Sequence, residues 1–318
     1  MVEELAFTGQ VAVVTGAAGG LGRAHAVLLA ERGCRVVVND LGTPFGDDVP
    51  VAQAVVDEIV AAGGEAVADT HDVVTDGRAV VATALEAFGA LDVVVNNAGI
   101  GAGTPIGPDA VEQWRATVDV TLAGSVAVTG AAWEHLQRSV AGRVVMTSSP
   151  AMFGAPATVP YSATKSAMYG LTRSLAGAGR RHGVAVNAIL PTASTRLTRA
   201  LPPGPMTELF EARDPVERVA SFVAWLCHPS CPVTGESFSV GGGRAARVAL
   251  AENRGVVLPE GADPASWGER LDELLDTTDV AFPSSMNDEV TWQAATLGGE
   301  VPVELAPGGA LHWDRRPR

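Results

Sequence analysis

Short apolar runs alternate along this chain with longer stretches in which apolar residues recur every three or four positions. The short runs predict buried strands and the longer periodic stretches predict helices. Strands are expected at residues 10–15, 35–39, 65–70, 91–95, 143–147, 184–190 and 237–240. Helices are expected at 20–33, 51–63, 75–88, 109–138, 161–181 and 214–227. This alternation favours parallel strands with right-handed crossovers, so the sequence predicts an α/β, doubly wound, Rossmann-like sheet.

The composition changes after Gly243, which divides the chain into two predicted parts. Residues 1–243 are expected to form the Rossmann domain, and residues 244–318 a helical and irregular extension packed on it. Within the extension, helices are expected near 266–275 and 287–297, without a further strand–helix–strand unit. The Pro-rich stretch 191–214 follows a strand and predicts a lid, with a surface Ω-loop as the alternative.

Two sequence pairs have the spacing of a helix capping box. Asp214 with Glu217 is expected to cap the helix that reaches residue 227, and Ser266 with Glu269 the first helix of the extension.

The 318 residues carry a formal net charge of −14, which excludes some classes of partner. Nucleic acid and anionic membrane surfaces both require a basic face, so neither is expected. The N-terminus lacks a basic and apolar leader, and no apolar run approaches membrane-spanning length, so we expect a soluble cytoplasmic protein. Cys34, Cys227 and Cys231 are expected to be buried free thiols, and the scattered histidines argue against a metal site.

A glycine-rich turn, TGAAGGLG at residues 15–22, lies between the first predicted strand and helix. Gly16 permits the turn, Gly20 lets the backbone approach a pyrophosphate, and Gly22 allows close packing of the helix. Gly19 and Leu21 belong to the same turn and are expected to contact the cofactor. A plain loop is the alternative, but the flanking strand and helix favour a dinucleotide site.

Asp40 ends the second predicted strand, where an acidic side chain can bind the adenosine ribose and repel a 2′-phosphate. Gly19 and Leu41 occupy two places where a basic residue would accept that phosphate. We therefore expect NAD and not NADP, although Asp40 could simply end a strand. Asp72, followed by Val73, could cap the adenine amino group or could be a turn residue.

Lys165 is the only lysine among 22 basic residues, and Tyr161 is one of two tyrosines. Residues four apart share one face of a helix. A compact ammonium can bind two ribose hydroxyls and lower the pKa of a neighbouring phenol from its usual value near ~10. The phenol could then act as a general base, although coding bias toward arginine also explains a single lysine.

Five motifs together resemble the short-chain dehydrogenase/reductase family over residues 7–243: TGxxxGxG at 15–22, NNAG at 96–99, Ser149, YxxxK at 161–165 and PxxxT at 191–195. The resemblance implies that Tyr161 is the general acid/base, that Lys165 binds the nicotinamide ribose and tunes Tyr161, and that Ser149 hydrogen-bonds the substrate oxygen. Further implied cofactor contacts are Asn97, Ala98, Gly99, Pro191, Ile189 and Thr195, the last two at the carboxamide.

Two departures from the family pattern affect these roles. Ser149 precedes Tyr161 by 12 residues where the family usually has 13, so Ser148 remains the alternative. Thr121 takes the place of the family's relay asparagine, and its shorter hydroxyl could hold a water there.

The segments VVVNDLG at 36–42, AAWEH at 131–135 and STRLT at 194–198 show a narrower resemblance, to the dehydrogenase domain of peroxisomal multifunctional enzymes and their bacterial relatives. That subgroup oxidises (3R)-hydroxyacyl-CoA thioesters, and some members accept hydroxysteroids. In it, the relay position can also depart from asparagine.

We therefore expect an NAD-dependent dehydrogenase of a 3-hydroxyacyl-CoA or of a related lipid or steroid ester. A dehydrogenase of a free hydroxysteroid or polyketide-type alcohol is the alternative, and an idle NAD-binding module is a third. Basic residues of the predicted lid, Arg196, Arg199 and Arg213, could receive a CoA phosphate or form a solvated face. Small and apolar residues on several faces of helices 109–138 and 161–181 predict a homodimer or homotetramer.

Overall fold

The computed structural model describes residues 5–42, 52–101, 106–107, 110–195, 204, 208 and 215–298. The chain divides into two compact units, residues 1–247 and residues 248–318, and each is described by itself. Within the described residues, no helix combines the length and the apolar character needed to cross a membrane.

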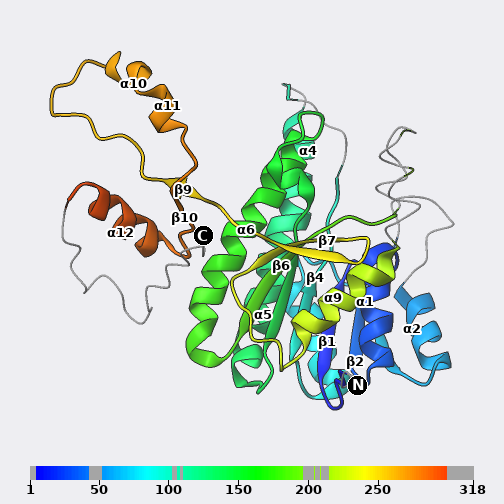
Figure 1. Cartoon of the computed structure of the whole chain (residues 1–318). Helices are drawn as coiled ribbons and strands as arrows, with labels where there is room; N and C mark the ends of the chain where they lie inside the picture. Colours follow the sequence, from blue (N-terminus) through cyan, green and yellow to red (C-terminus); the bar gives the residue numbers. More distant parts are fainter. Residues whose placement is uncertain are drawn as a thin grey trace. The chain divides into compact units, whose positions relative to one another are not determined.

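The first unit is built on one eight-stranded sheet (Figure 1). Its strands are β1 (Val11–Thr15), β2 (Arg35–Asn39), β3 (Glu65–Asp69), β4 (Val93–Asn96), β5 (Arg143–Thr147), β6 (Ala185–Pro191), β7 (Ser237–Gly241) and β8 (Arg244–Val248). They lie in the order β3-β2-β1-β4-β5-β6-β7-β8, and β1 to β7 pair in parallel. The order reverses direction between β1 and β4, and the ligand crevice of such sheets opens at this point, beside the carboxyl ends of the strands.

Helices cover both faces of the sheet, which explains why the strands are continuous apolar runs. Ala12 and Val14 of β1 pack in a core with α1 (Gly20–Glu31), α2 (Ala52–Ala61) and α9 (Val216–Cys227). Val11 and Val13 point to the other face and pack in a core with α3 (Gly77–Phe88), α5 (Gly124–Arg138) and α6 (Val159–Gly179). The predicted fold class is confirmed.

The eighth strand corrects the expectation that 237–240 is the last. The glycines after β7 form a turn between β7 and β8, with positive φ angles of 58° at Gly242 and 83° at Gly243. Two consecutive positive φ angles are what a tight hairpin turn requires, so these glycines connect two strands.

The expected single helix 109–138 is three elements in the structure, α4 (Val111–Val118), a π-helical turn η2 (Asp119–Ala123) and α5. The apolar spacing runs through the junctions, which is why the sequence pattern did not mark them. Such π-turns occur frequently at functional sites, and η2 carries Thr121.

One predicted capping box is untested and the other is wrong. Pro215 is the N-cap of α9, without a side-chain cap of its own, while Asp214 lies outside the described residues, so the box at 214 and 217 stays a prediction. Ala265 is the N-cap of α10 (Ser266–Glu269), again without a side-chain cap. The turn before α10 is instead fixed by the carboxylate of Asp263, which accepts a hydrogen bond of 2.8 Å from the Ala265 N–H.

The second unit contains short elements joined by an antiparallel ribbon of β9 (Glu252–Asn253) and β10 (Val280–Ala281). The expected helix near 266–275 is split into α10 and α11 (Leu271–Leu274), and α12 (Met286–Thr296) matches the second expected helix. The Trp292 side chain of α12 donates a 3.2 Å hydrogen bond to the Asn253 carbonyl, which ties this helix to the ribbon. The expected packing of this unit on the Rossmann domain stays a prediction.

Candidate active site

The glycine-rich turn lies between β1 and α1, as the sequence predicts. Gly16 and Gly20 have φ angles of 63° and 53°, in the left-handed region that favours glycine. A Cβ on Gly22 would lie 2.2 Å from the Gly16 carbonyl oxygen, so the helix can approach the turn only with glycine there. Gly19 is the N-cap of α1 and Leu21 lies in its first turn, where backbone N–H groups have no partner within the helix. The turn therefore presents free N–H groups suited to an anion.

Asp40 at the end of β2 is connected directly to this turn. Its carboxylate accepts a 3.0 Å hydrogen bond from the Ala18 N–H and a 3.2 Å bond from the Gly42 N–H. Leu41, 59% exposed, follows it on the surface. The acidic group thus lies beside the predicted phosphate site, where the adenosine ribose of a dinucleotide would reach it.

Asp72 and Val73 follow β3 and form a fixed turn. The Asp72 carboxylate accepts a 2.8 Å hydrogen bond from the Val74 N–H, and the Asp72 carbonyl accepts one of 2.8 Å from Asp76. Val73 is buried, and a Cβ on Gly124 would lie only 2.7 Å from its Cγ2. Asp72 is therefore a turn residue, the alternative that the sequence left open, while a contact with adenine stays a prediction.

The segment after β4 is fastened to the glycine-rich turn. The Asn97 Nδ2 donates 3.0 Å hydrogen bonds to the carbonyls of Thr15 and Gly16, and the Thr15 hydroxyl accepts bonds of 3.0 Å from the N–H groups of Asn97 and Ala98. A Cβ on Gly16 would lie 2.8 Å from the Ala98 Cα. The role of Thr15 was missed, because only the fold brings residues 15 and 97 together.

Tyr161 and Ser149 meet at the carboxyl end of β5. Tyr161 lies in the first turn of α6 and is half-buried, and Gly101 is close enough that a Cβ there would lie 3.0 Å from the ring. Burial raises the pKa of the Tyr161 phenol, and a hydrogen bond with the Ser149 hydroxyl opposes this by lowering it. The net shift is upward, so the lowered phenol pKa implied by the resemblance is not present in the chain alone.

Lys165 lies one helical turn after Tyr161 and is almost fully buried. Its Nζ donates a 2.6 Å hydrogen bond to the Thr147 carbonyl and lies 5.5 Å from the centroid of the Tyr161 ring. Burial lowers the pKa of the ammonium to about 8. The lysine is thus a cation held beside the phenol at neutral pH.

The hydroxyls of Ser148 and Ser149 have different hydrogen-bond partners. Ser148 is only 2% exposed, and its hydroxyl donates a 2.7 Å hydrogen bond to the carbonyl of Lys165. The Ser149 hydroxyl instead contacts Tyr161 and accepts a 3.1 Å bond from the Ala151 N–H. Of the two serines, the structure places Ser149 at the phenol.

Thr121 is fully buried on η2, and among the described residues its hydroxyl has no hydrogen-bond partner. A Cβ on Gly99 would lie 3.1 Å from the Thr121 Oγ1 and 3.5 Å from the Lys165 Nζ. Both polar atoms therefore face the space above Gly99. A buried, unpaired hydroxyl opposite an ammonium suits a bridging water.

The end of β6 supplies the remaining predicted residues. Ile189 is fully buried and its carbonyl accepts a 2.8 Å bond from the Ser148 N–H, while Pro191 ends the strand. Thr195 reaches the start of α1, since its Cγ2 would lie 3.7 Å from a Cβ on Gly20. Most of the predicted lid lies outside the described residues, including Arg196, Arg199 and Arg213.

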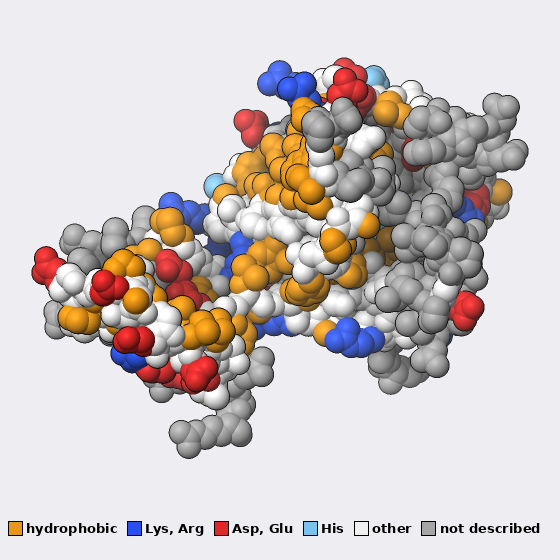
Figure 2. All heavy atoms as spheres, turned by 90° about the horizontal axis from the view of Figure 1, so that it is seen from above, with side chains coloured by type: hydrophobic (Ala, Val, Ile, Leu, Met, Phe, Trp, Pro, Cys, Tyr) orange, Lys and Arg blue, Asp and Glu red, His pale blue; other side chains and the backbone are white. Residues whose placement is uncertain are grey.

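Hydrophobic side chains gather in several groups on the upper face of the molecule (Figure 2). One large exposed hydrophobic residue close in sequence to the site is Phe153, which is 69% exposed and ends the short 3₁₀ helix η3 (Pro150–Phe153) directly after Ser149. An exposed aromatic side chain thus follows Ser149 by four residues in the sequence.

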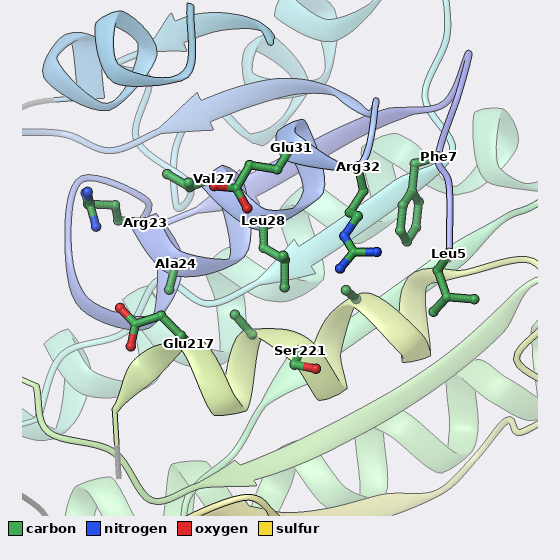
Figure 3. Close-up of a pocket in the computed structure, with 12 residues that line it drawn as sticks. Leu5, Phe7, Arg23, Ala24, Val27, Leu28, Glu31, Arg32, Glu217 and Ser221 are labelled. Carbon is green, nitrogen blue, oxygen red and sulfur yellow. The ribbon is translucent and has the colours of Figure 1, made fainter. Parts of the chain in front are cut away.

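A groove of about 710 Å³ lies between α1 and α9 (Figure 3). Residues of both helices line it together with Leu5 and Phe7. None of the predicted site residues lines this groove, so it is separate from the candidate active site.

Comparison with known proteins identifies the family. A model of the short chain dehydrogenase family matches residues 10–203. The peroxisomal multifunctional enzyme type 2 of Drosophila melanogaster is 41% identical over 311 residues, which cover 96% of this chain and 51% of that protein. This chain therefore spans about half the length of that relative.

Two mycobacterial proteins match over most of their own length. A putative short-chain type dehydrogenase/reductase of Mycobacterium tuberculosis is 42% identical over 275 residues, which cover 84% of this chain and 94% of that protein. The crystal structure of a short chain dehydrogenase from Mycobacterium avium is 39% identical, with a TM-score of 0.72, and the match covers 84% of this chain and 95% of that one. The fold, the glycine-rich turn, the pair Tyr161 and Lys165 and these matches agree, and the chain belongs to the short-chain dehydrogenase family of oxidoreductases.

Proposed function

We propose that this enzyme is an NAD-dependent dehydrogenase that oxidises the secondary alcohol of a 3-hydroxyacyl-CoA or of a related lipid or steroid CoA ester. The convergence of Tyr161, Ser149 and Lys165 carries the proposal, because it supplies a proton acceptor, a hydrogen-bond donor and a cation at one place. Bound NAD would supply the hydride acceptor. Its fit is supported by the glycine-rich turn, where a Cβ on Gly16 or Gly22 would clash with backbone atoms, so that the helix N-terminus lies close to the turn.

The chemistry assigned to the chain is proton transfer and charge stabilisation. Tyr161 as phenolate takes the proton of the substrate hydroxyl, and Ser149 donates a hydrogen bond to the oxygen that becomes a carbonyl. The Lys165 ammonium, 5.5 Å from the ring centroid, favours the phenolate over the neutral phenol. Its three N–H donors allow it to bind the ribose hydroxyls while it retains the bond to Thr147.

The choice of substrate is supported by the resemblance to the dehydrogenase domain of multifunctional enzymes and by the exposed Phe153 near Ser149. A free hydroxysteroid or polyketide-type alcohol is the second candidate for the same site. Incubation of the purified protein with NAD and a panel of 3-hydroxyacyl-CoA esters and free hydroxysteroids separates the two. NADH formation with the thioesters is expected, whereas turnover of free alcohols alone would replace the first candidate by the second. No turnover with either class would favour the idle NAD-binding module.

Cofactor preference is expected to depend on Asp40. In the wild type, catalytic efficiency with NAD should exceed that with NADP, because the carboxylate at this position repels a 2′-phosphate. Asp40→Ala should reduce the difference in catalytic efficiency between NAD and NADP. It should also weaken NAD binding, since the carboxylate holds the Ala18 N–H of the glycine-rich turn. Steady-state kinetics with both cofactors test this, and equal efficiencies in the wild type would contradict the NAD assignment.

Thr121 is expected to hold a water between its hydroxyl and Lys165 that carries protons away from the site. Thr121→Ala should then slow turnover, while Thr121→Asn should be tolerated, because an amide also binds water. Thr172→Val is a matched control, since Thr172 is equally buried and its hydroxyl binds only the Met168 carbonyl, at 2.7 Å. Turnover of Thr121→Ala equal to that of the control would exclude the relay.

The expected homodimer or homotetramer remains a prediction. Support comes from α5 and α6, where Val126 is 47% exposed and a Cβ added to Gly130 or Gly170 would meet open space. The cytoplasmic location and the assignment of residues 191–214 as a lid likewise rest on the sequence alone.

A further inference from the structure

Three consecutive residues at the end of β5 each hold one of the two proposed catalytic residues of α6. The Thr147 carbonyl accepts the hydrogen bond from the Lys165 Nζ, the Ser148 hydroxyl donates to the Lys165 carbonyl, and the Ser149 hydroxyl contacts the Tyr161 phenol. The first and third contacts involve reacting groups. The second, from Ser148, has no part in the mechanism described so far.

The hydrogen bond from Ser148 connects the end of β5 to the backbone of α6. A helical carbonyl already accepts one bond from the residue four positions later, and its second lone pair is free for a side chain. At Lys165 that second position is taken by Ser148, at 2.7 Å, with both residues at most 3% exposed. Ser148 is itself fixed by the sheet, because its N–H donates a 2.8 Å bond to the Ile189 carbonyl of β6. The sheet thereby fixes the backbone of α6 at Lys165.

We propose that Ser148 is a positioning residue. Its hydroxyl fixes the position of the Lys165 backbone relative to the end of β5, and this in turn places the ammonium beside Tyr161. This inference rests on the proposed roles of Tyr161 and Lys165. Without the Ser148 bond, Lys165 is attached to β5 only through its flexible side chain. The ammonium then spends less time where it favours the phenolate.

The residues named at this contact come from three elements. Helix α6 contributes Lys165 and Tyr161, the end of β5 contributes the neutral Thr147, Ser148 and Ser149, and η2 contributes the neutral Thr121. The pKa of Lys165 is lowered by burial alone, with no carboxylate among the causes. A change in the titration of Lys165 itself therefore reports on how closely the ammonium is held in this buried place.

The chain has a single lysine, which makes a direct measurement possible. With ¹³C-labelled lysine, one nuclear magnetic resonance signal of the ε-methylene group reports the titration of Lys165 alone. Ser148→Ala is expected to raise the Lys165 pKa by roughly 0.5 to 1 unit, because a less tightly held ammonium is better hydrated and one lost hydrogen bond corresponds to about this much. The pH at which NAD affinity falls should move upward by a similar amount.

Thr172→Val is again the matched control, because it removes a buried hydroxyl that binds a carbonyl of the same helix, away from Lys165. It should lower the unfolding temperature without moving the Lys165 pKa. Ser148→Thr keeps the hydroxyl and should restore the wild-type pKa. Ser148→Cys keeps the volume with a weaker donor, should give a smaller rise, and serves if Ser148→Ala does not fold.

An unchanged Lys165 pKa in Ser148→Ala, or an equal shift in Thr172→Val, would overturn the positioning role. The titration needs no substrate, so its result stands apart from the proposed function. That function fails instead if Tyr161→Phe retains wild-type turnover.

Discussion

Tyr161→Phe is expected to lower kcat by roughly 10²- to 10⁴-fold, the usual contribution of positioned proton transfer. The substitution removes the proton acceptor and keeps the ring, so the contact with the Gly101 backbone is retained. NAD affinity should stay close to the wild-type value, because the phosphates are bound at the glycine-rich turn and not at the phenol. Steady-state kinetics and a fluorescence titration of NADH measure the two quantities separately.

Tyr169→Phe is the natural control for this result. Tyr169 lies two turns further along α6, is 6% exposed, and accepts a 3.0 Å hydrogen bond from Arg173 at its phenol oxygen. Its removal should leave turnover near the wild-type level. Equal turnover in the two variants would remove Tyr161 from the mechanism.

Lys165→Arg is expected to reduce turnover and NAD affinity together, even though the positive charge is kept. The ammonium occupies a tight site, with the Thr147 carbonyl 2.6 Å away and a Cβ on Gly99 only 3.5 Å away. A planar guanidinium is larger and directs its donors differently, so it cannot bind both the carbonyl and the ribose hydroxyls in this space. The reverse exchange Arg173→Lys, on the same helix, is the control and should be nearly silent.

The pH dependence of NAD binding also tests the role of Lys165. Burial lowers the pKa of Lys165 to about 8, so the ammonium is charged below that pH and neutral above it. Wild-type NAD affinity should therefore fall as the pH rises through about 8. In Lys165→Arg the guanidinium stays charged, and the weaker affinity should not vary over this range. The same pH dependence in both proteins would show that Lys165 does not contact the cofactor.

Features encoded by neighbouring residues were predicted well from the sequence. The strand, turn and helix at 10–33 carry their signals locally, in an apolar run, the four glycines of the turn and a helical repeat. Features that depend on backbone detail were missed. The π-turn η2 continues the apolar spacing of its flanking helices, and Gly242 and Gly243 signal a turn without saying whether a strand follows.

The candidate site shows the same division. The motif at 161–165 places Tyr161 and Lys165 on one helical face from spacing alone. The choice between Ser148 and Ser149 could not be made by counting, because it depends on which hydroxyl meets Tyr161 across the gap between β5 and α6. Both the Ser148 bond to Lys165 and the Thr15 bonds to residues 97 and 98 join distant positions, and only the folded chain reveals them.

The eighth strand restricts how copies of this chain can associate. By pairing with β7, β8 occupies the edge through which the parallel part of the sheet would otherwise be open to a neighbouring molecule. The new edge carries Arg244 and Arg247, both exposed, and charged side chains on an edge strand discourage pairing with another strand. A continuous sheet running from one copy into the next is thus disfavoured at this edge, which favours self-association through helix faces at this end of the sheet.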